Sequence, residues 1–184
     1  MTRLWLVRHG PTHAKTLVGH TDLPADLSDT AALARLTEAL PPAPIVSSDL
    51  IRTVTTADAI AGTRPRLPPD RDFREFHYGA WENRPFEDFD GPLSRAFFER
   101  PGDVRPPGGE SWHDVARRVE AALARHAHRD ELIVICHFGV ILILWSIAEG
   151  LAPEDALAQP VDPLSLTRID WGSAPKGHFV NQGP

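Results

Sequence analysis

A run of five apolar residues, Leu132-Ile133-Val134-Ile135-Cys136, stands directly before His137. An apolar run rich in β-branched side chains predicts a strand that is covered on both faces. A second apolar run, Leu4 to Val7, belongs to the first strand that we expect and ends in Arg8-His9-Gly10-Pro11. Neither a strand nor a helix is expected to continue through that segment, because of its glycine and proline. Two buried strands therefore each end at a histidine.

Between proline-rich loops, the chain alternates between apolar strands and segments with helical spacing. Helices are predicted over Asp29–Leu40, Asp49–Ala61, Ser111–Arg125 and Phe138–Glu149, and two further strands over Ile45-Val46 and Ser165–Asp170. This alternation predicts an α/β fold: a three-layer α/β/α sandwich with a mostly parallel central sheet. We expect one domain over residues 1–184, because this length buries a substantial core without disulfides or metal ions.

Composition excludes several classes of function. The chain carries 19 Lys and Arg against 25 Asp and Glu, a net charge of −6, which disfavours nucleic acid or an anionic membrane as a partner. Cys136 is the only cysteine, so no internal disulfide or multi-cysteine zinc site can form, as is typical of a reducing compartment. No apolar run is long enough for a membrane span. We expect a cytoplasmic protein.

Reactive side chains follow three of the predicted strands. Arg8-His9 follows the first strand, Ser47-Ser48-Asp49 with Arg52 one turn later follows the second, and His137 follows the Leu132–Cys136 strand. Ligands of such sheets gather beyond the carboxyl ends of the strands, so we expect these side chains to meet there.

The residue types indicate phosphate chemistry. Arginine matches phosphate oxygens with two parallel hydrogen bonds, and an imidazole is a nucleophile when one nitrogen is unprotonated. A carboxylic acid is also needed to protonate a leaving oxygen, and Glu75, in an aromatic-rich loop that raises its pKa, is the candidate. Each residue alone is more often an ordinary surface or ion-pair residue. Their convergence on one sheet edge favours a site for a phosphoryl group.

Several segments then resemble the histidine phosphatase superfamily, which has the phosphoglycerate mutase-like fold. The resemblance appears in the family's order and rests on Leu6-Val7-Arg8-His9-Gly10 with Thr12, Ser47 to Thr53, Arg74 to Glu82, Gly108 to Ser111, and Cys136-His137-Phe138-Gly139. It departs from the usual family pattern at Pro11, Lys15 and Phe138, none of which removes a catalytic group.

The resemblance implies a two-step phosphomonoesterase reaction on a small phosphate ester. His9 would attack phosphorus and Glu75 would act as general acid and then as general base. Arg8, Arg52 and His137 would hold the phosphoryl oxygens, and Thr12 is a candidate contact in the phosphate loop. No metal and no cofactor are implied.

Other functions remain open on the sequence. An α-ribazole phosphatase of cobalamin synthesis carries a similar Arg-Glu-x-x-x-Gly-x-Trp-Glu segment. A phosphoglycerate mutase is expected to be longer, and a catalytically silent phosphate-binding module would need no general acid. The aromatic residues from Tyr78 to Phe98 are interpreted as a small satellite core and not as a ligand site.

Overall fold

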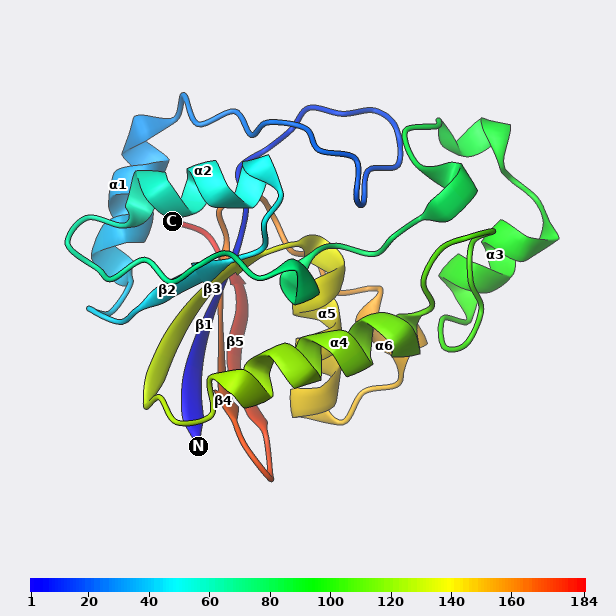
Figure 1. Cartoon of the computed structure of the whole chain (residues 1–184). Helices are drawn as coiled ribbons and strands as arrows, with labels where there is room; N and C mark the ends of the chain where they lie inside the picture. Colours follow the sequence, from blue (N-terminus) through cyan, green and yellow to red (C-terminus); the bar gives the residue numbers. More distant parts are fainter.

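The computed structural model describes residues 1–184 and contains one five-stranded sheet in the order β2-β3-β1-β4-β5 (Figure 1). The strands are β1 (Thr2–Arg8), β2 (Ile45–Ser47), β3 (Glu131–Cys136), β4 (Leu166–Trp171) and β5 (Lys176–Gln182). The helices are α1 (Thr30–Ala39), α2 (Ile51–Ile60), α3 (Pro92–Glu99), α4 (Trp112–Arg125), α5 (Phe138–Glu149) and α6 (Pro153–Ala156). Three 3₁₀ turns lie at η1 (Arg71–Phe73), η2 (Gly79–Trp81) and η3 (Phe86–Asp88).

The centre of the sheet is parallel and one side of it is antiparallel. Strand β3 pairs in parallel with both β1 and β2, whereas β4 is antiparallel to β1 and β5 is antiparallel to β4. The β5 strand was not predicted, and it extends the sheet beyond the late strand that the sequence indicated. The α/β prediction with a parallel centre is confirmed.

Helices cover both faces of the sheet, as the apolar run before His137 predicted. Leu132, Val134 and Cys136 pack into the larger core cluster, together with buried residues of α4 and α5. Ile133 and Ile135 point into the smaller cluster, which α1 and α2 complete. Every residue from 132 to 136 is fully buried. The alternation of side chains along one strand thus joins the three layers of the sandwich.

Two of the predicted helices begin at residues whose side chains cap the helix. Asp29 precedes α1 and its side chain accepts the backbone N–H of Ala32. Ser111 and Asp114 form a reciprocal capping box at the start of α4. Both caps satisfy N–H groups that have no partner inside the helix.

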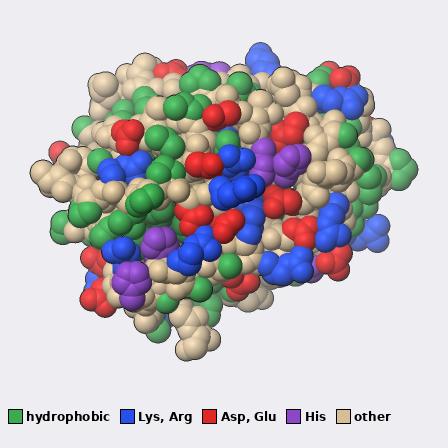
Figure 2. Space-filling view, in the orientation of Figure 1, with side chains coloured by type: hydrophobic (Ala, Val, Ile, Leu, Met, Phe, Trp, Pro, Cys, Tyr) green, Lys and Arg blue, Asp and Glu red, His purple; other side chains and the backbone are tan.

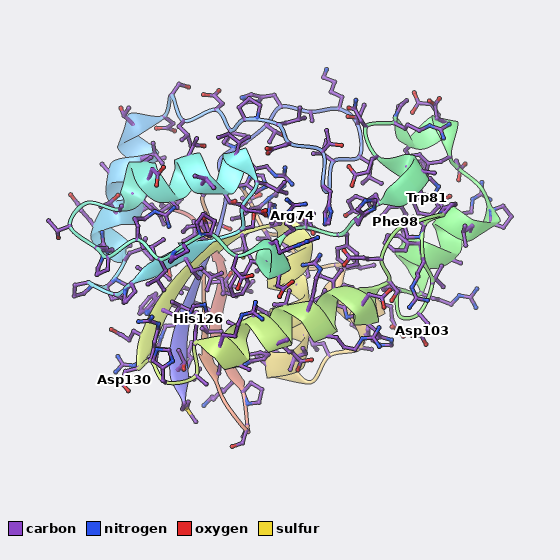
Figure 3. All side chains as sticks on the ribbon, viewed as in Figure 1. Arg74, Trp81, Phe98, Asp103, His126 and Asp130 are labelled. Carbon is purple, nitrogen blue, oxygen red and sulfur yellow. The ribbon has the colours of Figure 1, made fainter.

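The aromatic segment differs from its prediction. Tyr78, Trp81 and Phe97 belong to the main core cluster, in continuity with the residues of α4 and α5, and do not form a separate satellite core. Trp81 of η2 and Phe98 of α3 lie side by side, with ring centroids 6.4 Å apart (Figure 3). The expectation of a divided core was wrong because the sequence shows aromatic density but not the direction in which each ring packs.

No helix of this chain combines the length and the apolar character needed to cross a membrane.

Candidate active site

The carboxyl ends of β1, β2 and β3 lie side by side at one edge of the sheet. The backbone N–H of His9 donates to Cys136 O over 3.1 Å, and that of Ser48 donates to Ile135 O over 3.1 Å. These bonds tie the residues that follow each strand to the central strand β3. The three clusters that the sequence placed at strand ends are therefore brought together.

His9 is buried and its protonation pattern follows from its contacts. Its Nδ1 lies 2.7 Å from Gly10 O, and because a carbonyl oxygen can only accept, Nδ1 carries the hydrogen. Nε2 is then the unprotonated nitrogen, and Arg52 Nε donates to it over 3.3 Å. Burial, with the nearby positive charge of Arg52, lowers the pKa of His9 to about 3. The imidazole is therefore neutral, with a lone pair on Nε2.

Arg52 is a buried cation at the start of α2. Its two terminal nitrogens donate to Thr21 O over 2.9 Å and to Gly19 O over 2.6 Å. The residue is 1% exposed, and its guanidinium is held on one side by backbone carbonyls and on the other by His9. Its orientation depends on the 19–21 segment.

Arg8 supplies a second guanidinium to the same region. It donates to Val161 O, and its Nε is buried without a hydrogen-bond partner. The Phe138 ring lies under the guanidinium, with its centroid 5.3 Å from Cζ. Burial lowers the pKa of Arg8, but an arginine keeps its charge in a protein. An anion is the natural partner for a donor in this position.

Glu75 is a buried carboxyl group whose two oxygens each accept a backbone N–H. Phe76 N donates to Oε1 and Gly139 N donates to Oε2, both over 3.0 Å. Burial raises the pKa of Glu75 more than these donors and the two arginines lower it. A carboxyl group with a raised pKa can carry a proton and deliver it.

The backbone of Glu75 is fixed from outside the site. Arg118 on α4 donates to the carbonyl oxygens of Asp72, Arg74 and Glu75 over 2.7–2.8 Å. His20 Nε2 donates to the same Glu75 O over 3.0 Å. Arg118, which also pairs with the Glu110 carboxylate, was not predicted as a site residue, because only the fold brings these carbonyl groups to it.

His137 lies behind His9 and is fully buried. The two imidazole centroids are 5.1 Å apart in an edge-to-face arrangement. His137 Nε2 lies 2.8 Å from Ser48 Oγ, and its Nδ1 has no hydrogen-bond partner. Burial, and the nearby His9 and Arg52, lower the pKa of His137 well below its usual value.

A cavity of about 230 Å³ opens at this edge of the sheet. Five of the six predicted site residues line it, whereas His137 is not among the lining residues and lies behind His9. The lining consists of Arg8, His9, Thr12, Ala14, Thr16, Val18, Arg52, Glu75, Tyr78 and Phe138. Arg8, Arg52 and His9 all line this cavity, so the net charge of the chain does not describe the site. On the outer surface, Figure 2 shows Lys, Arg and His side chains near the centre of one face with Asp and Glu around them, where Figure 3 labels Arg74.

The sequence pointed less clearly to the apolar side of the cavity. Tyr78 was interpreted as core and Phe138 as a departure from a family pattern, yet both line the cavity. Both also line a second, mostly apolar cavity of about 90 Å³ that includes Phe97 and Trp112. Tyr78 and Phe138 therefore contribute both to the hydrophobic core and to the lining of the site cavity. Lys15 is exposed and does not line the cavity.

Comparison with known proteins gives the class. The model of the histidine phosphatase superfamily (branch 1) matches residues 4–177. The chain belongs to the histidine phosphatase superfamily.

Individual relatives are similar over nearly the whole chain. The probable phosphoglycerate mutase GpmB of Proteus mirabilis strain HI4320 is 29% identical over 189 residues, which cover 95% of this chain and 87% of that protein. The crystal structure of TTHB049 from Thermus thermophilus is 31% identical, with a TM-score of 0.77 over 100% of both chains. A structure of a putative alpha-ribazole-5′-P phosphatase from Escherichia coli K-12 shares the fold, with a TM-score of 0.82 at 24% identity over 98% of this chain and 96% of that chain.

Proposed function

We propose that this protein is a metal-independent phosphomonoesterase that hydrolyses a small phosphorylated metabolite through a phosphohistidine on His9. The observation that carries this proposal is the state of His9 Nε2. That nitrogen is unprotonated, because Nδ1 donates to Gly10 O, and it lies beside the Arg52 guanidinium in a cavity. An unprotonated imidazole nitrogen next to a fixed cation is suited to attack an electrophile that carries negative charge.

In the first step, His9 Nε2 forms a bond to phosphorus while the bond from phosphorus to the ester oxygen breaks. Glu75 transfers its proton to that oxygen, so the alcohol leaves as a neutral molecule. The positive charge that develops on the His9 ring is stabilised by Gly10 O, which accepts from Nδ1. Arg8 and Arg52 stabilise the phosphoryl oxygens from fixed positions.

In the second step, water attacks phosphorus and the bond to His9 Nε2 breaks. The Glu75 carboxylate, which lost its proton in the first step, takes one from the attacking water. Inorganic phosphate leaves, and both His9 and Glu75 return to their starting protonation states. In this mechanism the two guanidinium groups supply the positive charge that a divalent cation supplies in other phosphoryl-transfer enzymes.

The remaining lining favours an ester whose alcohol part carries no second negative charge. Besides Arg8, Arg52 and His9, the cavity presents only hydroxyl, apolar and aromatic groups and the carboxyl group of Glu75. The carboxylate of a phosphoglycerate would meet no third cation there. This lining favours hydrolysis over the mutase reaction that the name of the Proteus mirabilis relative indicates. Hydrolysis of an α-ribazole phosphate is compatible with the same lining.

The test is hydrolysis of p-nitrophenyl phosphate in the presence of EDTA, with acid-labile phosphoenzyme trapped by rapid quenching. We expect turnover, and we expect His9→Ala to abolish both turnover and labelling. His13→Ala is the matched control, since His13 is an exposed histidine that pairs with Asp26 outside the cavity. Undiminished turnover in His9→Ala would refute the nucleophile, loss of activity in EDTA would refute metal independence, and faster exchange between 2- and 3-phosphoglycerate than hydrolysis would favour the mutase.

A further inference from the structure

Two buried hydroxyl groups lie in line behind His137. Ser48 Oγ is 2.8 Å from His137 Nε2 and 2.7 Å from Thr53 Oγ1. All three residues are fully buried. Such a row of hydrogen bonds has one direction at a time, because each hydroxyl group donates a single hydrogen.

The carbonyl groups around Thr53 determine that direction. Thr53 Oγ1 is 2.8 Å from Leu50 O and 3.0 Å from Ser48 O. Carbonyl oxygens can only accept, so the single hydrogen of Thr53 lies toward them. Thr53 Oγ1 therefore accepts the hydrogen of Ser48.

The orientation of the Ser48 hydroxyl group determines which nitrogen of the His137 ring carries the hydrogen. Because the Ser48 hydrogen is directed to Thr53, Ser48 Oγ presents a lone pair to His137 Nε2, and Nε2 carries the hydrogen. His137 Nδ1 is then the unprotonated nitrogen of the neutral ring, and it is buried without a partner. This is the opposite of His9, whose Nδ1 carries the hydrogen.

We propose that Ser48 and Thr53 are positioning residues that hold His137 as the Nε2–H tautomer, ready to take up a proton on Nδ1 when a phosphoryl group binds. The uptake of a proton when a phosphoryl group binds rests on the proposed function, whereas the tautomer does not. The protonated ring then donates from Nε2 to Ser48 and from Nδ1 to a phosphoryl oxygen, with no hydroxyl group having to turn.

The charges around His137 agree with a proton that arrives with the ligand. His9 follows β1, Arg52 comes from α2, Arg118 from α4, and His20 from the loop before α1. Arg52 and Arg118 carry positive charge that lowers the pKa of His137 in the empty site, whereas the depressed pKa values of His9 and His20, about 3 and about 4, leave these two rings neutral. A bound phosphate dianion offsets the charge of the two arginines. The Glu75 carboxyl group, which accepts the backbone N–H of Gly139, can also change its protonation when phosphate binds, so the test has to exclude it.

The first test is the tautomer of the empty wild-type protein. Long-range proton–nitrogen NMR correlations of ¹⁵N-labelled protein distinguish the two neutral forms of an imidazole, with His137→Gln used to assign the signal. We expect hydrogen on Nε2 of His137. Hydrogen on Nδ1 in the wild type would overturn the proposal, and this result does not depend on whether the protein is a phosphatase.

Variants test the relay itself. Thr53→Val keeps the shape but removes the acceptor of the Ser48 hydrogen, so that hydrogen turns to Nε2 and the tautomer switches to Nδ1–H. Thr53→Ser restores the acceptor and is expected to restore the wild-type tautomer. Ser47→Ala is the matched control, because Ser47 is an adjacent and equally buried serine whose hydroxyl has no partner. A wild-type tautomer in Thr53→Val would contradict the relay.

Calorimetry of inorganic phosphate binding in two buffers of different ionisation enthalpy measures the proton taken up. Measurements in a Glu75→Gln background, at mildly alkaline pH, exclude the carboxyl group and keep phosphate as the dianion. We expect uptake of about one proton there, and about tenfold weaker binding with less uptake after adding Thr53→Val, since the Ser48 hydrogen then lacks its acceptor and turns toward Nε2, where it opposes the N–H of the imidazolium. Equal uptake and affinity with Thr53→Val would overturn the proposal. Retained hydrolysis by His9→Ala would instead refute the proposed function and leave the tautomer result standing.

Discussion

Arg52 donates from its Nε to Nε2 of His9 over 3.3 Å, so the guanidinium lies against the same nitrogen that we propose attacks phosphorus. This contact has two consequences. It adds positive charge beside the ring and helps burial to keep the imidazole neutral. It also places the cation that we propose binds phosphate within reach of the proposed nucleophile, which favours an oriented transfer.

Replacing Arg52 by lysine tests the geometry of this cation and not only its charge. Lysine cannot donate at once to His9, Gly19 O and Thr21 O, so its ammonium group is expected to lie elsewhere. We expect the affinity for inorganic phosphate, measured by calorimetry, to fall by about ten- to a hundredfold. Arg74→Lys is the control, because Arg74 forms a partly exposed ion pair with Asp49 and is expected to change affinity less than about twofold. Equal affinities in the two variants would contradict this role of Arg52.

Replacing Glu75 by glutamine separates binding from proton transfer. The amide has nearly the same shape but cannot deliver a proton, so kcat is expected to fall by about 10² to 10⁴ for alkyl phosphates while phosphate affinity changes little. An aryl phosphate with a good leaving group needs less protonation and is expected to lose less. Steady-state kinetics on matched alkyl and aryl esters measures the ratio. A uniform loss on all esters would show that Glu75 does not protonate the leaving group.

The pKa of His9 predicts how stability depends on pH. The folded value of about 3 lies below the ordinary value of 6.5, so within that window the unfolded chain binds the proton that the folded one does not. The free energy of unfolding is therefore highest above pH 6.5, where the ring is neutral in both states, and it decreases as the pH falls below 6.5. At pH 5 the loss is expected to be about 2 kcal/mol, since each pH unit below the unfolded pKa is worth about 1.4 kcal/mol.

His9→Gln removes this dependence and leaves other titrations common to both proteins, including that of His20. Between neutral pH and pH 5, we expect the free energy of unfolding, measured with urea, to fall by about 2 kcal/mol more in the wild type than in the variant. His13→Gln serves as the exposed control. If the difference in the free energy of unfolding between His9→Gln and the wild type were the same at both pH values, His9 would not be held neutral by the fold.

The parts of the fold that the sequence predicted are those with a buried, periodic pattern. The buried strand β3 and the apolar face of α4 could be predicted because local spacing alone indicates them. β3 is a continuous apolar run, and the apolar residues of α4 recur at helical spacing. Strand β5 was missed because it is an edge strand with exposed and half-buried residues, including Gly177 and His178. Helix α3 was missed because it starts at Pro92 inside an aromatic segment whose pattern has no clear period.

The same distinction holds for the candidate site. His9, Arg52 and His137 follow buried strands or begin the next helix, so their position in the sequence already predicts convergence at one edge. Thr53 and Arg118 could not be found in this way, since they act on backbone carbonyls and on a buried hydroxyl group. Those partners come within reach only when distant segments pack together, so neither residue type nor local spacing predicts these contacts.

Glu82 is a further residue of this kind, and its contacts lead to the last prediction. Its carboxylate accepts the backbone N–H groups of Gly19, His20, Thr21 and Tyr78, together with the Thr21 hydroxyl group, over 2.7–3.1 Å. Burial opposes the charged form, but these five donors hold the pKa of Glu82 below its usual value. The carboxylate therefore fixes the 19–21 segment.

That segment carries the two carbonyl groups that hold Arg52, so we expect Glu82 to act through the backbone on the orientation of this proposed phosphate-binding residue. In Glu82→Gln the amide NH₂ faces N–H donors, and we expect a loss of about 2–4 kcal/mol in the free energy of unfolding, since buried donors are left without an acceptor. Phosphate affinity, measured where both proteins are folded, is expected to fall by about tenfold as Arg52 loses its fixed orientation. Glu87→Gln, an exposed glutamate five residues along the chain, should change neither quantity. A Glu82→Gln protein that is less stable but binds phosphate like the wild type would show that the segment serves the fold alone and that Arg52 keeps its place without it.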